Sequence, residues 1–76
     1  MATKAFVLIE VAVGSSKEVI AALKQLKEAT SIDVVTGPYD IIAIIEAETL
    51  SEIGDIVTGK IHPIAGISRT VTCLAI

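Results

Sequence analysis

The stretch IIAIIEAE, residues 41–48, is a run of mostly β-branched apolar residues that ends in two carboxylates, and it is typical of a β-strand. Successive side chains of a strand point to opposite faces of a sheet, and in the first five positions of this stretch both faces are apolar. A sheet with helices on one face and water on the other would alternate apolar with polar residues. The strand is therefore predicted to have apolar contacts on both faces.

The opening stretch KAFVLIEVAV, residues 4–13, shows the same two-sided pattern. Its odd-numbered residues from Val7 to Val11 would point to one face, and Phe6 and Leu8 to the other. The second face of the sheet is therefore predicted to have a charged rim around an apolar centre, made of Phe6, Leu8, Ile42 and Ile44.

An apolar patch with a charged rim usually marks an interface. A chain of 76 residues has too little material to cover both faces of its own sheet, and domains this small are often stabilised by oligomerisation. We therefore predict a homodimer that forms through the second sheet face, or a larger ring built from such dimers. A strand buried inside a larger core and a flat cofactor on this face are the two alternatives.

The remaining elements follow from turn and capping signals. Strands are predicted over residues 4–13, 31–36, 41–48 and 67–76, and helices over residues 16–29 and from Thr49 to about Gly59. Ser15 with Glu18, and Thr49 with Glu52, have the spacing of a capping box at a helix start. The order βαββαβ predicts an α+β, ferredoxin-like fold, in which two helices cover one face of a four-stranded antiparallel sheet.

Length and composition exclude several classes of protein. We predict a single domain over residues 1–76, with a net charge of −3, one cysteine and one histidine. These counts rule out an internal disulfide and argue against a clustered metal site, and the acidic balance argues against a nucleic-acid surface. No stretch approaches the roughly 20 apolar residues of a membrane helix, and no signal peptide is evident, so a cytoplasmic protein is expected.

Few residues favour catalysis. His62 precedes a proline at a helix end, and Cys73 lies among apolar strand residues, where it is typical of a small hydrophobic residue. Glu46 and Glu48 share one strand face but fit a solvated rim better than an acid–base pair. No glycine-rich nucleotide-binding motif is present. We expect no enzymatic activity, no metal and no cofactor.

One group of polar residues could line a small-molecule pocket. Thr70 and Thr72 share a face of the last strand with Ser68, and the turn GPYD, residues 37–40, precedes the third strand. Asp40 could bind a ligand ammonium group, and Tyr39 could form an aromatic wall. Ordinary strand packing and turn chemistry are the alternative explanations.

Three stretches resemble a known family. VTGPYDII, residues 35–42, is similar to the V-T-G-x-Y-D-hydrophobic signature of the Lrp/AsnC family of bacterial and archaeal feast/famine regulators. GISRTVT, residues 66–72, resembles the family's G-V-x-R-T-x-T strand, and AFVLIEV, residues 5–11, resembles its opening strand. The resemblance spans essentially the whole chain and corresponds to the effector-binding RAM domain, without the helix-turn-helix.

The resemblance implies the βαββαβ fold, dimers that pair through their sheets, and octameric or similar rings. It also implies that an effector, typically an amino acid, binds between dimers. The site residues that it implies are Thr36, Gly37, Pro38, Tyr39, Asp40, Thr70 and Thr72. Pro38 departs from the acidic or small residue that is commoner there, and it removes one backbone N–H donor.

These observations lead to a hypothesis of a non-enzymatic, oligomeric module that senses amino acids and modulates transcription, with co-assembly with full-length regulators as one route. The alternative is a structural partner module that binds no metabolite. An ACT domain shares the element order, and a dimeric α+β-barrel enzyme shares the sheet-to-sheet dimer, but the residues favour them less. Direct DNA binding and membrane attachment are not expected.

Overall fold

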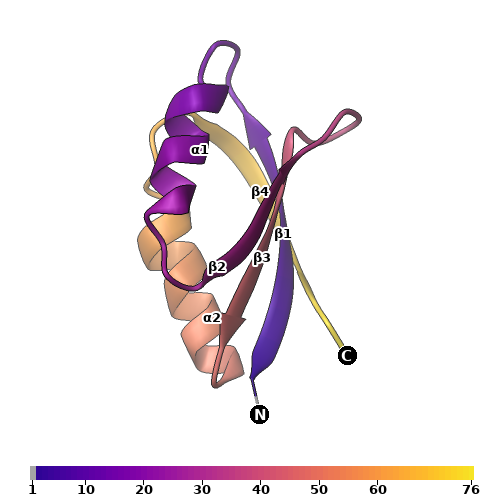
Figure 1. Ribbon diagram of the computed structural model, residues 1–76, viewed down its shortest axis with the longest axis vertical. Helices are drawn as coiled ribbons and strands as arrows, with labels where there is room; N and C mark the ends of the chain where they lie inside the picture. Colours follow the sequence, from indigo (N-terminus) through magenta and orange to yellow (C-terminus); the bar gives the residue numbers. More distant parts are fainter. Residues whose placement is uncertain (1) are drawn as a thin grey trace.

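A computed structural model describes residues 2–76 and confirms the ferredoxin-like prediction. The elements are β1 (Thr3–Val11), α1 (Ser16–Lys24), β2 (Ala29–Val34), β3 (Ile41–Ala47), α2 (Leu50–Ile56), a π-helical turn η1 (Val57–Ile61) and β4 (Ile67–Leu74). The strands form one sheet in the order β2-β3-β1-β4, and all neighbouring strands are antiparallel. Both helices lie on the same side of the sheet (Figure 1).

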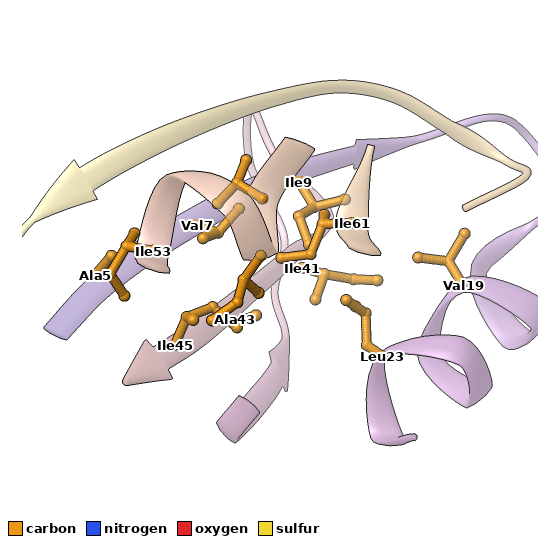
Figure 2. Packing of buried hydrophobic residues seen from close by; sticks show 12 residues of the cluster. Ala5, Val7, Ile9, Val19, Leu23, Ile41, Ala43, Ile45, Ile53 and Ile61 are labelled. Carbon is orange, nitrogen blue, oxygen red and sulfur yellow. The ribbon is translucent and has the colours of Figure 1, made fainter. Parts of the chain in front are cut away.

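The core lies between this sheet face and the helices. β1 and β3 contribute alternate residues, α1 contributes Val19 and Leu23, and the α2–η1 segment packs over the other end of the sheet (Figure 2). The buried set is Ala5, Val7, Ile9, Val19, Leu23, Ile41, Ala43, Ile45, Ile53, Ile56, Val57 and Ile61. Because the odd-numbered residues of β1 and β3 fill this core, their even-numbered neighbours must lie on the opposite face.

The opposite face carries the predicted apolar centre. Cross-strand partners point to the same face, and the register places Phe6 between Ile44 of β3 and Cys73 of β4. Leu8 lies between Ile42 and Val71 in the same way. Phe6, Leu8, Ile42 and Ile44 are each only half-buried, and Val71 and Cys73 are exposed. We call these six residues the open face, because no element among residues 2–76 covers them.

One of the two predicted capping boxes forms. Thr49 Oγ1 accepts a hydrogen bond from the Glu52 amide at 3.1 Å, and Glu52 Oε1 accepts one from the Thr49 amide at 3.1 Å. At Ser15 the prediction is wrong, because the Ser15 side chain makes no capping hydrogen bond. The Ser15 backbone (φ −102°, ψ 2°) lies outside the extended conformation in which an N-cap hydroxyl reaches the first helical amides.

The predicted first helix, over residues 16–29, was too long. The helix ends at Lys24, and its last turn tightens through hydrogen bonds from Gln25 N to Ala22 O and from Leu26 N to Leu23 O. Ala29 is already part of β2 and pairs with Ile45 of β3. At Ala29, pairing of β2 with β3 therefore outweighs the local propensity for helix.

The second helix does not end at Gly59, as the sequence predicted. Its backbone widens into the π-helical turn, which runs through Gly59 to Ile61 and is closed by a hydrogen bond from His62 N to Val57 O at 2.9 Å. Val57 and Ile61 are both buried, so burial of apolar side chains continues through the widened turn. The strand ends also shift by one or two residues, with β1 ending at Val11, β2 at Val34 and β4 at Leu74.

Gly66 holds the start of β4 against the start of α1. It has a positive φ of 100°, its carbonyl accepts a hydrogen bond from Ala12 N at 2.7 Å, and a side chain there would meet Ser15 Cβ at 2.7 Å. Only glycine satisfies both the backbone conformation and this close approach.

Replacing Gly66 by alanine should therefore lower the free energy of unfolding by about 2 kcal/mol or more, which urea denaturation would measure. Gly54→Ala is the matched control, because Gly54 is helical and a Cβ there meets nothing within 4 Å. That variant should gain up to about 1 kcal/mol from helix propensity. Equal effects of the two substitutions would contradict this account of Gly66.

Candidate functional site

The turn between β2 and β3 is held against the end of β1 by its last residue. Val35 N donates to Asp40 O at 2.9 Å, which closes the turn, and Gly37 allows the chain to reverse with a φ of 136°. Asp40 N donates to Ile9 O at 2.9 Å, and Asp40 Oδ2 accepts from Val11 N at 2.9 Å. Asp40 therefore clamps the turn onto β1 at the point where the β1–β4 register shifts.

The clamped turn brings Tyr39 to the edge strand β4. Arg69 Nη2 donates a hydrogen bond to the Tyr39 hydroxyl at 3.2 Å, and the Arg69 Cζ atom lies 5.4 Å from the centre of the Tyr39 ring. Both values are consistent with a guanidinium held by a hydrogen bond and a cation–π contact at the same time. Arg69 is not among the predicted site residues, because no local pattern links it to a residue 30 positions earlier.

The two predicted threonines lie on the helix side of the sheet. Thr70 pairs with Ile9 across the strands, and its hydroxyl shares a hydrogen bond with His62 Nε2 at 2.9 Å. Thr72 pairs with Val7 and lines an apolar groove of about 250 Å³ between α2 and β4. The groove is lined by Leu50, Ile53, Gly54, Val57, Thr58, Thr72 and Leu74.

A single chain therefore divides the predicted site between two faces. Thr36, Gly37 and Pro38 are exposed in the β2–β3 turn, and Tyr39 and Asp40 are half-buried beside them. Thr70 and Thr72 lie on the helix side of β4, opposite to Arg69, which Tyr39 contacts. Their assignment to one ligand site remains a prediction.

A cleft beside α2 contains none of the predicted site residues. It has a volume of about 430 Å³ and is lined by Lys27, Glu28, Ala47, Glu48, Glu52, Asp55, Ile56 and Lys60. The Lys60 ammonium lies 2.9 Å from Glu28 Oε2, and this hydrogen bond is the main cause that lowers the pKa of the Glu28 carboxyl. The lining comes from β3, α2, η1 and the loops that precede β2 and α2, so no sequence motif marks the cleft.

The remaining reactive side chains stand apart from one another. His62 binds Thr70, Cys73 lies on the open face, and Glu46 pairs across the strands with Lys4. Among residues 2–76, no three His, Cys, Asp or Glu side chains lie close enough to hold a metal ion. No helix in the described part of the chain is long and apolar enough to cross a membrane.

Replacing Asp40 by asparagine should lower the free energy of unfolding less than replacing it by alanine. Asp40→Asn keeps an oxygen that can accept from the Val11 amide, whereas Asp40→Ala leaves that amide without a partner and should cost about 1.5–3 kcal/mol of unfolding free energy. Urea denaturation and hydrogen exchange at the Val11 amide would measure the difference. Similar protection of that amide in both variants would show that the clamp does not hold the turn.

Comparison with known proteins places this fold among ligand-binding domains. The family model described as the Lrp/AsnC ligand binding domain matches residues 4–76. An uncharacterised HTH-type transcriptional regulator of Pyrococcus furiosus is 32% identical over 78 residues, which cover 99% of this chain and 52% of that protein. The chain thus spans about half the length of this curated relative.

Two solved structures illustrate the likeness in three dimensions. The crystal structure of FFRP-DM1 is 35% identical, with a TM-score of 0.93, and the match covers 97% of this chain and 99% of that one. A transcriptional regulator of Neisseria meningitidis, solved as a complex with L-Met, has a TM-score of 0.91 over 97% of this chain and 49% of that one. At 13% identity, the second likeness shows the fold alone.

Proposed function

The chain belongs to the Lrp/AsnC family, as a ligand-binding domain, and on this premise we propose that it is a non-enzymatic, oligomeric module that senses an amino acid and acts in transcriptional regulation. The observation that carries the proposal is the family match over residues 4–76. The L-Met complex of the Neisseria regulator with the same fold favours an amino acid as the class of ligand. A regulatory role would place the protein in the cytoplasm, where Cys73 stays reduced.

The open face is the surface through which we propose that two copies pair. Its two apolar rows, Ile44–Phe6–Cys73 and Ile42–Leu8–Val71, run across β3, β1 and β4. At each end a cation lies across from an anion, Lys4 from Glu46 and Arg69 from Glu10. A second copy offers the same pattern, so a two-fold interface would bury the apolar rows and keep the charges at the rim.

Ile44→Lys should therefore separate the dimer without unfolding the domain. Ile44 lies in the open face and outside the buried core, and a desolvated ammonium there should weaken the dimer by at least about thirtyfold, equivalent to roughly 2 kcal/mol. Sedimentation equilibrium would measure the dissociation constant, and circular dichroism would confirm folding. Val34→Lys is the control, because Val34 is 66% exposed at the end of β2. A monomeric wild-type protein would contradict the interface.

We propose that the effector binds where subunits of neighbouring dimers meet. In one chain Tyr39 contacts Arg69, on the side of β4 that bears the open face, whereas Thr70 and Thr72 lie on the helix side. A site that uses both sets would need a contribution from a second chain. Under this proposal, Thr36, Gly37, Pro38, Tyr39 and Asp40 of one subunit and Thr70 and Thr72 of another enclose the amino acid.

A ligand at such an interface changes the protein by favouring one assembly over another. It can shift the equilibrium only by as much as its affinities for the two assemblies differ. Mixed assembly with full-length regulators is the route by which we propose that the protein affects transcription. The competing function is a structural partner module that assembles in the same way but binds no metabolite.

Native mass spectrometry of the purified protein with each of the twenty standard L-amino acids at millimolar concentration would separate the two functions. We expect an even-numbered assembly that carries at least one of these amino acids as a bound ligand. The same assembly without bound ligand in every sample would overturn the sensor function and favour the structural module. Asp40→Asn should lose the ligand but keep the assembly if the Asp40 carboxylate binds the ammonium group.

A further inference from the structure

Arg69 is a cation whose position is set by protein contacts but whose charge is not matched by them. The Tyr39 hydroxyl accepts one of its N–H groups at 3.2 Å, and the Tyr39 ring lies under the guanidinium carbon at 5.4 Å. These two contacts use one N–H donor and one flat side of the group. An arginine side chain has five N–H donors, so the others remain free for a ligand.

Among residues 2–76, no carboxylate forms an ion pair with Arg69. Glu10 is its cross-strand partner and shares its face of the sheet, yet the Arg69 guanidinium bonds to Tyr39. The single ion pair in the described part of the chain joins Lys60 to Glu28, in the cleft beside α2. An exposed guanidinium held by an aromatic ring, with its forked donors unpaired, is suited to bind a carboxylate in two-point fashion.

The turn beside Arg69 holds Tyr39, the residue that contacts the Arg69 guanidinium. Asp40 commits its amide to Ile9 O and its Oδ2 atom to Val11 N, and this clamp holds the neighbouring Tyr39 at β4. Asp40 thus acts on Arg69 indirectly, as a positioning residue. Arg69, held beside the turn by Tyr39, therefore presents a positive charge that no carboxylate among residues 2–76 pairs with.

We propose that Arg69, oriented by Tyr39, binds the α-carboxylate of the amino acid effector. This inference rests on the proposed sensor function and deepens it, because it names the group of the ligand that the turn recognises. A free α-carboxylate is present in every amino acid, so Arg69 would supply affinity for the whole class. The choice among amino acids would then depend on other residues that contact the ligand side chain.

The first test uses the unaltered protein and pairs of probes. Native mass spectrometry would compare the twenty standard L-amino acids with their α-carboxamides, which keep the ammonium group and side chain but lack the carboxylate charge. We expect every amino acid that binds to bind at least about tenfold more tightly than its carboxamide, as the loss of a charged hydrogen bond implies. Equal binding of acid and carboxamide would overturn the role of Arg69 while leaving the sensor function in place.

The second test identifies the residue. Arg69→Gln should lose at least about tenfold in affinity for the acid and show no preference for it over the carboxamide. Arg69→Lys should recover part of the preference, because it restores the charge without the forked donors. Lys24→Gln removes the same charge from the exposed end of α1 and should bind as the wild type does.

The outcomes separate the two proposals. If Arg69→Gln binds the acid as tightly as Lys24→Gln does, the inference is wrong. If no standard amino acid binds the wild-type protein, the sensor function fails, and the inference fails with it. Since the acid–carboxamide comparison needs no substitution, equal binding of acid and carboxamide overturns the inference even where a variant at Arg69 does not fold.

Discussion

The structure depends on a mismatch between two apolar sheet faces and a single layer of helices. β1 and β3 are the central strands, and their odd-numbered residues are buried under α1, α2 and η1. Their even-numbered residues form the middle of the open face, which no described element covers. Burial of one large aliphatic side chain contributes about 1.5–3 kcal/mol, against a net stability of about 5–15 kcal/mol for a whole domain. Burial of the open face would therefore contribute a free energy that is a large fraction of the net stability of the domain. For this reason self-association is central to the proposed function.

A second constraint fixes the end of the sheet that carries the β2–β3 turn. Asp40 ties the β2–β3 turn to β1, and the turn in turn places Tyr39 against Arg69 on the far strand β4. Four strands are thereby connected at one end of the sheet by side chains and a turn. The VTGPYDII and GISRTVT stretches, which resemble the family's motifs, meet at this end, whereas the cleft beside α2 contains none of their residues. The fold, the proposed assembly and the proposed ligand site thus all involve β1.

Local signals accounted for much of the fold but not for its boundaries. The two-sided pattern of residues 41–48 predicted both the buried and the open row of β3, and the capping box at Thr49 formed as expected. The first helix was shortened because β2 must pair with β3 from Ala29 onward. The second helix passed beyond Gly59 because burial of Ile61 continues the core. In both cases tertiary contacts outweighed propensities of less than about 1 kcal/mol per residue.

The sequence by itself determined the element order, the two apolar faces of β1 and β3 and, through the VTGPYDII and GISRTVT stretches, the family. These properties depend on periodicity and short motifs, which are local. Only the tertiary structure decided that Thr70 and Thr72 lie on the helix side, that Asp40 binds the backbone of β1, and that Arg69 meets Tyr39. Each of these depends on strand register and sheet order, which join residues about 30 or more positions apart and leave no trace in local sequence.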